Sequence, residues 1–315
     1  MNATSSSAPR STSTPAVAGE RALVLGGGGS TGNAWLIGVI AGLFDAGLDV
    51  TGADLVIGTS AGSTAAAQIS GASPTELFSA ILAAAARQPI HPAGTAGSAG
   101  PDGPGRARPA SEHLERTGRI IAAAGDAADM RRRMGAAALD MAAASDGSGQ
   151  ARWRATVSSR LPSQRWPQQR VLLTAVDART GEPVVFHRHS GIHLADAVAA
   201  SCASGFAYRI GENSYIDGGY RRNENADLAA GYQRVLVLSP FSGRTRMPLA
   251  WGMQLAAQVE ELRTGGSTVQ TIFPDSGSEH MFGANAMDAS LRPAAARAGY
   301  SQGSALAGQL TKFWG

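Results

Sequence analysis

Near the start of the chain, short apolar runs that end in glycine alternate with helical patterns. Residues 21–26 (RALVLG) predict a buried strand, and residues 53–58 (ADLVIG) predict a second one. Between them, Asn33 is placed to cap a helix that extends to about Ala46. The apolar positions of that helix recur three and four residues apart and predict its buried side: Trp35, Leu36, Val39, Ile40 and Leu43.

A further helix follows the second strand immediately, and another begins at Ser73–Pro74, where serine can cap and proline fits the first turn. Strands and helices that alternate with short connections predict a parallel sheet covered by helices on both faces. The sequence therefore predicts an α/β fold of three layers, α/β/α, with a mostly parallel central sheet.

The same alternation returns after residue 170. The predicted strands cover residues 171–178, 183–187, 214–219, 234–240 and 268–274, and the predicted helices cover residues 194–202, 249–263 and 293–313. Between these two parts, residues 91–110 are rich in Gly, Pro and Ala and predict a mobile loop, which precedes a helical, Arg-bearing stretch. We interpret residues 87–150 as an insertion or lid within one domain that spans residues 21–315. The Ser, Thr and Pro content of residues 1–20 predicts a disordered tail.

Composition excludes several classes of protein. The formal net charge of +3 is too small to indicate nucleic-acid binding, and no apolar run is long enough to span a bilayer. The one cysteine, Cys202, excludes an internal disulfide and suits a reducing compartment. The N-terminal residues lack the apolar core of a signal peptide. We therefore expect a cytoplasmic protein.

A candidate nucleophile lies where the second predicted strand meets its helix. Residues 58–62 (GTSAG) fit G-x-S-x-G, a turn that lifts a serine hydroxyl clear of a sheet, here that of Ser60. The helix that follows directs its positive end at an anion formed there. The alternative is a glycine-lined turn whose serine only caps the helix. The strand before the motif and the helix after it favour the nucleophile.

The glycine run after the first strand, LGGGGSTGNAW, allows two interpretations. Gly27, Gly29 and Gly32 fit G-x-G-x-x-G, which by itself indicates a nucleotide. A dinucleotide site also needs an acidic residue about 20 positions on, at the end of the next strand. The available aspartates do not end a strand, and the second strand runs into GTSAG instead. We therefore favour a loop whose amides stabilise an oxyanion beside Ser60.

The candidate base is Asp217, in YIDGG at the end of a short predicted strand. For an isolated D-G-G, a turn aspartate would be the ordinary explanation. Its place at a strand end, where α/β folds collect their chemistry, favours a catalytic role.

A full triad is the rival arrangement, because Ser60, Asp217 and His280 occur in the order found in α/β-hydrolases. Against it, the candidate nucleophile follows only the second strand, and His280 lies in a polar stretch typical of a surface loop. His187, His189 and His193 have no nearby set of Cys, Asp or Glu that would make a metal site. We expect these histidines to be structural or solvent-exposed.

Taken in order, the glycine-rich loop, G-x-S-x-G and the downstream D-G-G resemble the patatin-like phospholipase family, especially its bacterial members. The block at residues 195–229 (ADAVAASCASGFAYRIGENSYIDGGYRRNENADLA) is similar to the family's region around its catalytic aspartate. The resemblance implies a Ser–Asp dyad without histidine, in which Ser60 is the nucleophile and Asp217 the base. It also implies an oxyanion hole from the amides of Gly27, Gly28 and Gly29, and neither a metal nor an organic cofactor.

Two positions depart from the family pattern. Thr31 stands where the family's loop usually carries Arg or Lys, which bears on the strength of the oxyanion hole. Residues 203–205 read Ala-Ser-Gly, where the family often has proline, which bears on the wall of the pocket.

The resemblance implies a serine lipid acyl hydrolase, phospholipase A or esterase-like, that acts on a lipid or ester substrate. Two alternatives stay open at this point: a catalytically idle relative that binds lipid or a partner protein, and an acyltransferase that uses the same acyl-enzyme. The amphipathic helix of the insertion could pack on the domain, act as a lid or contact a membrane surface, and we favour packing.

Overall fold

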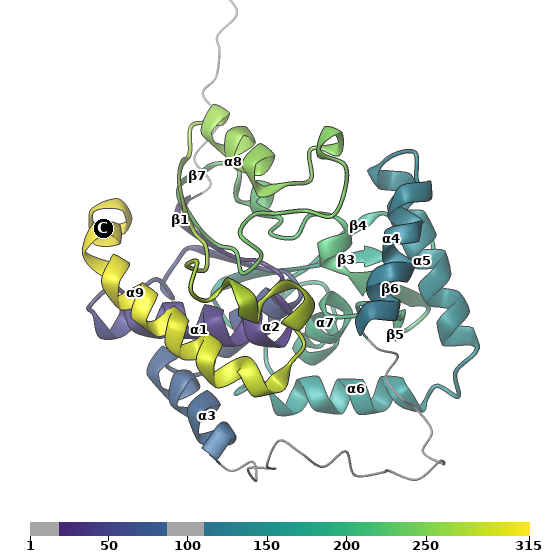
Figure 1. Ribbon diagram of the computed structural model, residues 1–315, viewed down its shortest axis with the longest axis horizontal. Coiled ribbons are helices and arrows are strands. Elements are labelled where there is room, and N and C mark those ends of the chain that lie inside the picture. Colours follow the sequence, from purple (N-terminus) through teal and green to yellow (C-terminus); the bar gives the residue numbers. More distant parts are fainter. Residues whose placement is uncertain (1–18, 87–109) are drawn as a thin grey trace, which may run out of the picture.

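A computed structural model describes residues 19–86 and 110–315 of the protein. The predicted tail and the predicted mobile loop fall almost entirely outside these residues. Within them, an eight-stranded sheet is packed between helices (Figure 1). The strands are β1 (Gly19–Leu25), β2 (Leu55–Gly58), β3 (Arg170–Asp177), β4 (Pro183–Phe186), β5 (Tyr208–Ile210), β6 (Asn213–Asp217), β7 (Tyr232–Leu238) and β8 (Thr268–Ile272).

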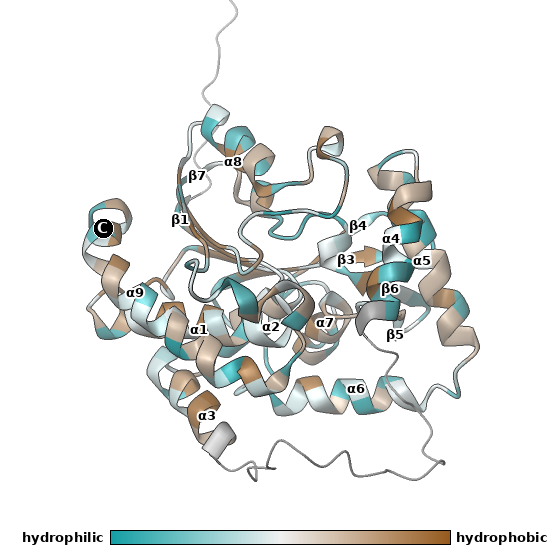
Figure 2. Cartoon of the chain, in the orientation of Figure 1, coloured by the Kyte–Doolittle hydropathy of each residue, from teal (hydrophilic) through white to brown (hydrophobic). Residues whose placement is uncertain are grey.

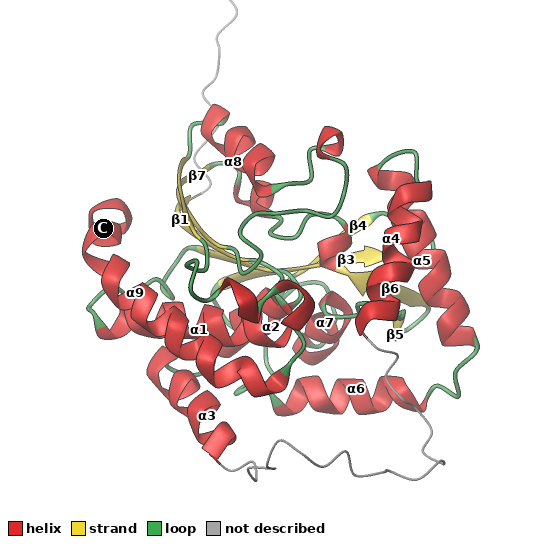
Figure 3. Cartoon of the chain, in the orientation of Figure 1, coloured by secondary structure: helices red, strands yellow, loops and turns green. Residues whose placement is uncertain are grey.

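Helices lie on both faces of the sheet, so the chain forms the three α/β/α layers predicted from its sequence (Figure 3). They are α1 (Gly29–Asp45), α2 (Ala61–Ile69), α3 (Pro74–Ala86), α4 (Ala110–Ala123), α5 (Ala127–Ala143), α6 (Ser148–Ser159), α7 (Leu194–Ser201), α8 (Leu255–Thr264) and α9 (Arg292–Trp314).

The sheet is mixed, with mostly parallel pairing. β1 pairs in parallel with β2 and β7, β2 with β3, and β7 with β8. β4 and β6 pair antiparallel with β3, and β5 pairs antiparallel with β6. The predicted α/β class with a mostly parallel sheet is confirmed.

The pairing of β3 brings two strand ends together. Leu173 of β3 pairs with Gly58 of β2, and Ala175 pairs with Asp217 of β6. Both of these β3 residues also pair with β4. Because β4 occupies one edge of β3, β2 and β6 must share the other edge, where they approach from opposite directions. The last residues of β2 and β6 therefore face each other.

The core follows the two-residue period of the strands. In β1, Leu23 and Leu25 pack into the apolar cluster formed with α1, α2, α7 and α9, whereas Ala22 and Val24 pack on the other face, with α8. These four side chains are 0% exposed. Burial of a leucine-sized side chain stabilises a fold by about 1.5–3 kcal/mol, so the strand is held on both faces. In Figure 2, brown dominates the edge-on strands β1 and β7.

Some predicted boundaries were wrong. Asn33 does not cap α1, which begins four residues earlier, after Gly28. Instead, the Asn33 side chain donates to Gln68 Oε1 at 3.0 Å. The helix predicted from residue 249 begins at Leu255, because Gly252 ends a preceding single turn with φ at +65°. The helix α6, whose apolar positions are only weakly periodic, and the three-residue strand β5 were not predicted.

Among the helices in the two described ranges, none combines the length and apolarity needed to cross a bilayer.

Candidate active site

Ser60 occupies a tight turn between β2 and α2. Its φ is +52° and its ψ is −115°, a conformation that costs free energy for any residue with a Cβ. The turn also requires close backbone contact, because a Cβ added to Gly62 would lie 1.9 Å from the Leu25 carbonyl oxygen. These features are those of a nucleophile elbow at the end of a strand.

The structure brings Ser60 and Asp217 together. Ser60 Oγ donates to Asp217 Oδ2 at 2.7 Å. The other carboxylate oxygen, Oδ1, accepts from the Gly219 amide at 2.8 Å, and the Ser60 amide donates to Ser201 Oγ at 3.0 Å. Each carboxylate oxygen therefore has a donor, and the serine hydroxyl points at a fixed acceptor.

Burial changes the chemistry of the Asp217 carboxyl. The residue is 6% exposed. Burial raises its pKa from 3.8 to about 6, although the hydrogen bonds from Gly219 and Ser60 act to lower it. A carboxylate with a raised pKa is a stronger base than an exposed aspartate, and at pH 7 it is still largely ionised.

The glycine-rich loop lies directly beside Ser60. A Cβ added to Gly27 would lie 3.6 Å from Ser60 Cβ and 2.6 Å from Asn223 Oδ1. The Gly27 amide donates to the Asn223 carbonyl oxygen at 3.0 Å. Within the described residues, the amides of Gly28 and Gly29 have no acceptor. These two amides lie at the N-terminal end of α1, where a helix attracts negative charge.

Asn223 and Glu224 hold this loop, and sequence reasoning gave neither of them a role. Asn223 Nδ2 donates to the Gly27 carbonyl oxygen at 3.2 Å and to Glu224 Oε1 at 2.9 Å. Glu224 is 1% exposed and also accepts from Ser239 Oγ at 2.7 Å. Burial raises the pKa of Glu224, against the effect of these hydrogen bonds. The buried Glu224 carboxyl therefore joins Asn223, which contacts the glycine loop, to Ser239 directly after β7.

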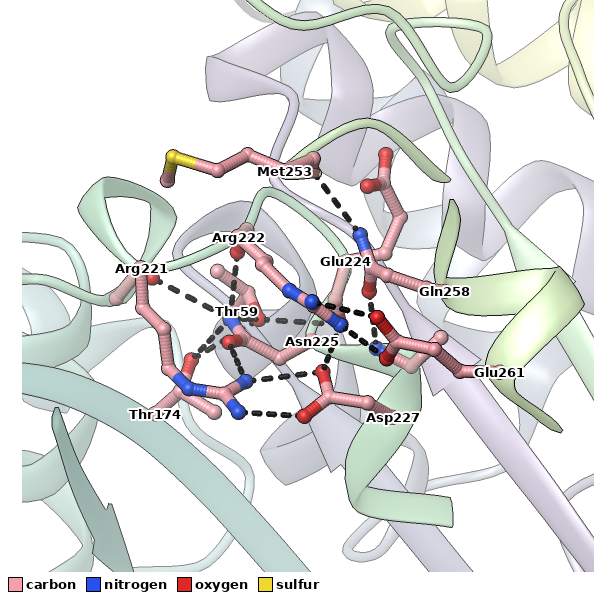
Figure 4. Close-up of polar contacts among 12 residues, drawn as sticks. Thr59, Thr174, Arg221, Arg222, Glu224, Asn225, Asp227, Met253, Gln258 and Glu261 are labelled. Atoms are coloured by element: carbon pink, nitrogen blue, oxygen red, sulfur yellow. Dashed lines mark hydrogen bonds and ion pairs between the residues drawn. The ribbon is translucent and has the colours of Figure 1, made fainter. Parts of the chain in front are cut away.

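The Asn225 carboxamide joins three parts of the site (Figure 4). Asn225 is 0% exposed, and its φ of +55° is tolerated by asparagine more than by most residues. Its Nδ2 lies 3.0 Å from Thr59 Oγ1, 3.2 Å from Thr174 Oγ1 and 3.3 Å from the Gly218 carbonyl oxygen. Since Thr59 and Gly218 are sequence neighbours of Ser60 and Asp217, one side chain contacts the backbone segments of both.

An outer layer of ion pairs surrounds Asn225 (Figure 4). Arg221 pairs with Asp227 and also donates to Asn225 Oδ1 at 2.6 Å. Arg222 donates to both carboxylate oxygens of Glu261, at 2.6 and 2.8 Å. These contacts fix the segment after the D-G-G turn to α8. No sequence signal within the motifs identified this network: Arg222 and Glu261 lie 39 residues apart, and the pairs that are closer in sequence belong to no motif.

The structure does not bring His280 to the proposed dyad. His280 is exposed, and its Nδ1 lies 3.0 Å from the Gly277 carbonyl oxygen. His187 and His189 contact each other, with ring centroids 6.0 Å apart. Across residues 19–86 and 110–315, no group of three or more His, Cys, Asp or Glu side chains is arranged to hold a metal ion.

The helix α4, in the predicted insertion, flanks the loop beside Asp217. The Asp217 amide donates to the Ala203 carbonyl oxygen at 3.1 Å. On the same loop, Ser204 Oγ lies 3.2 Å from His113 Nε2, and the Gly205 carbonyl oxygen accepts from Arg116 at 3.3 Å. The α4 helix therefore packs on the segment that supports the carboxylate, whereas its action as a lid stays a prediction.

The comparison with protein families identifies the class. Residues 23–230 match the family model described as patatin-like phospholipase, which is more than half of the chain. The chain therefore belongs to the patatin-like phospholipase family, and the resemblance seen in its motifs is confirmed. The matched region includes the glycine loop, Ser60 and Asp217. Family membership supports lipid hydrolase activity.

Similarity to solved structures is distant. VipD from Legionella pneumophila is 14% identical, with a TM-score of 0.40, over 92% of this chain and 67% of that chain. The type III effector protein ExoU is 16% identical, with a TM-score of 0.38, over 92% of this chain and 53% of that chain. The chain thus spans about half the length of ExoU. No curated protein sequence matches it.

Proposed function

We propose that the protein is a serine lipid acyl hydrolase of the phospholipase A or esterase type, which cleaves carboxylic esters through an acyl-serine intermediate. The observation that carries the proposal is the 2.7 Å hydrogen bond from Ser60 Oγ to Asp217 Oδ2. It joins a serine held in a strained turn to a buried carboxylate of raised pKa. A nucleophile within hydrogen-bond distance of its base is the arrangement that nucleophilic catalysis needs.

In the first half of the reaction, Ser60 Oγ attacks the ester carbonyl carbon while its proton passes to Asp217 Oδ2. The carbonyl π electrons move to the oxygen and form an oxyanion. When the tetrahedral intermediate collapses, the bond from carbon to the leaving alkoxide breaks. The alcohol leaves with the proton held by Asp217, and the acyl group stays on Ser60.

We assign the oxyanion to the amides of Gly28 and Gly29. Both lie at the positive end of α1 and have no acceptor within the described residues. Gly27, whose amide donates to the Asn223 carbonyl oxygen, gives the loop its close approach to Ser60. One oxyanion donor typically contributes about 10²–10³ in rate, so these two amides supply a large share of the lowering of the barrier.

In the second half, a water molecule attacks the acyl carbon and gives its proton to Asp217. The second tetrahedral intermediate collapses, the bond to Ser60 Oγ breaks, and the proton returns from Asp217 to the serine. The products are a carboxylic acid and the free enzyme. This sequence uses only the dyad, the loop amides and water.

A fluorophosphonate probe and a p-nitrophenyl ester, applied to the same samples, test the dyad. We expect wild type and His280→Ala to be labelled and to turn the ester over. Ser60→Ala should lose both activities, and Asp217→Asn should lose at least about 10³-fold in kcat/KM because it removes the base. If His280→Ala also abolishes turnover, a triad replaces the dyad.

Vesicles of a diacyl phospholipid test the lipid substrate. We expect free fatty acid to be released by wild type and not by Ser60→Ala. Release of an acylated product when a simple alcohol is added would instead indicate an acyltransferase. A wild-type protein that binds the vesicles but neither reacts with the probe nor releases fatty acid would be an idle lipid-binding relative.

A further inference from the structure

Arg292, the first residue of α9, contacts the first turn of α1. Its Nη1 donates to the Ser30 carbonyl oxygen at 2.6 Å and lies 3.3 Å from Ser30 Oγ. Its Nη2 donates to Asn33 Oδ1 at 3.1 Å. The guanidinium therefore binds both Ser30, which directly follows Gly29, and Asn33, about one helical turn further on.

This cation has no carboxylate partner. Across the described residues, no Asp or Glu side chain forms an ion pair with Arg292, and all of its acceptors are neutral. A positive charge beside the N-terminal turn of a helix is unfavourable. Burial lowers the pKa of Arg292, and the nearby charge of Arg160 lowers it further. The guanidinium thus lies beside the positive end of α1 without a counter-ion. The oxyanion of the proposed reaction supplies a negative charge at the neighbouring amides of Gly28 and Gly29.

Thr31, at the position where the family's loop usually carries Arg or Lys, contributes no positive charge to this turn. It is 0% exposed, and its Oγ1 donates to the Met281 carbonyl oxygen at 2.9 Å. Its amide donates to the Ala286 carbonyl oxygen at 3.0 Å. Thr31 therefore joins the loop to residues 281–286, while the only cation that contacts this turn within the described residues comes from α9.

The packing of α9 against α1 fixes the position of Arg292. A Cβ added to Gly38 would lie 2.1 Å from the Ala296 carbonyl oxygen, and one added to Gly299 would lie 2.4 Å from the Trp35 carbonyl oxygen. Helices in backbone contact at such positions have little freedom to slide. The side chain at the start of α9 is therefore presented to the first turn of α1 in one place.

We propose that Arg292 is a positioning residue for the oxyanion loop: it fixes the first turn of α1 and so aims the amides of Gly28 and Gly29. The inference rests on the proposed function for its effect on rate. Its effect on the loop itself is independent of any activity.

Kinetics of Arg292→Gln and Arg292→Lys test the effect on rate. Arg297→Gln is the matched control, because Arg297 lies on the same helix, is exposed, and forms no hydrogen bond or ion pair within the described residues. We expect Arg292→Gln to lower kcat about 10²-fold with little change in KM, since the loop amides act mainly in the transition state. A trifluoromethyl ketone, whose adduct with Ser60 carries an oxyanion, should lose the same factor in affinity.

Lysine can replace the charge but not the fork that reaches both Ser30 and Asn33. Arg292→Lys should therefore recover about tenfold of the loss. A purely structural defect would change KM and thermal stability without a parallel loss for the ketone. Equal kcat and equal ketone affinity in Arg292→Gln and Arg297→Gln would overturn the proposal.

Hydrogen exchange of the peptide that covers residues 26–36 gives a readout without substrate. We expect faster exchange in Arg292→Gln, an intermediate rate in Arg292→Lys, and wild-type exchange in Arg297→Gln. If wild type proves inactive towards all esters, the proposed function fails while this exchange still decides the role of Arg292. If Arg292→Gln does not fold, Arg292→Lys is compared with Arg297→Gln in both the kinetic and the hydrogen-exchange measurements. Exchange that is identical in every variant would overturn the positioning role.

Discussion

The two residues of the proposed dyad are held in place by different means. Around Ser60, the constraint is backbone packing: β2 and α2 are joined by a tight turn, and Gly62 lies against the Leu25 backbone of β1 with no room for a Cβ. Around Asp217, the constraint is a network of side-chain hydrogen bonds: Asn225 Nδ2 contacts both the Gly218 carbonyl oxygen and Thr174 Oγ1 of β3.

Substitutions on the serine side and on the aspartate side should therefore have different effects on folding and activity. A backbone contact cannot relax without moving a strand, so damage to the serine side should unfold the elbow. A hydrogen-bonded network can lose one member and keep the others, so damage to the aspartate side should be graded. Five measurements examine the two sides.

The largest effect should come from Gly62→Ala. The added Cβ would lie 1.9 Å from the Leu25 carbonyl oxygen, so the strand or the helix must move. We expect the free energy of unfolding to fall by about 3 kcal/mol or more, with loss of activity. Gly308→Ala is the control, because it is also helical and its Cβ would meet no atom within 4 Å. It should stabilise the protein by about 0.5–1 kcal/mol. Urea denaturation measures both, and equal values would contradict a backbone constraint at the elbow.

On the aspartate side, Asn225→Gly and Asn225→Ala should differ. Both remove the carboxamide from Thr59, Thr174 and Gly218, which should cost about 2 kcal/mol. Alanine must also adopt a φ near +55°, so it should cost about 1 kcal/mol more. Both variants should fold and keep reduced activity. Complete loss of folding in the glycine variant would show that the network behaves as one unit.

The pH dependence of turnover examines the proposed base, Asp217, directly. Because the pKa of Asp217 is raised to about 6, kcat/KM should fall about tenfold per pH unit below that value. The same acid-side fall in kcat/KM should persist in His280→Ala. A fall in kcat/KM with an apparent pKa near 4 would contradict the effect of burial on the Asp217 carboxyl.

The raised pKa of Asp217 also makes the free energy of unfolding depend on pH. This contribution falls as the pH rises, whereas kcat/KM should increase. The folded protein binds the Asp217 proton more tightly than the unfolded chain, whose aspartate has the ordinary pKa of 3.8. The stabilising contribution of the protonated form is therefore present below pH 3.8 and is lost as the pH rises through about 6. Asp217→Asn should remove this dependence and should be more stable than wild type at pH 7, as denaturation at several pH values can measure.

The smallest effect should come from Glu261→Gln, in the outer layer of the aspartate side. The Glu261 side chain is 50% exposed, and the ion pair with Arg222 is therefore screened by solvent. We expect a loss of about 0.5 kcal/mol and unchanged kcat. Asp140→Asn, at an exposed carboxylate without an ion pair in the described residues, is the control and should change nothing measurable.

Sequence reasoning located the serine side more completely than the aspartate side. The elbow depends on residues 55–69, where a strand, a glycine-flanked serine and a helix follow one another, so local periodicity was enough to predict it. For Asp217, the D-G-G turn and a strand end were visible, but the rest of its setting was not. Asn225 and Glu224 carry no local signature, since a buried polar residue is distinguished from a surface one only by its neighbours in space.

By itself, the sequence determined the α/β class, the glycine loop after the first strand, and the turn that presents Ser60. Each follows from hydrophobic period and from the absence of Cβ atoms, which are properties of short segments. The tertiary structure decided that Asp217 meets Ser60, because β6 runs antiparallel to β3 and ends opposite β2 on the same edge. It also decided that Arg292 reaches the first turn of α1, across more than two hundred and fifty residues of chain. Such meetings depend on strand direction and helix packing, and no spacing within the sequence encodes them.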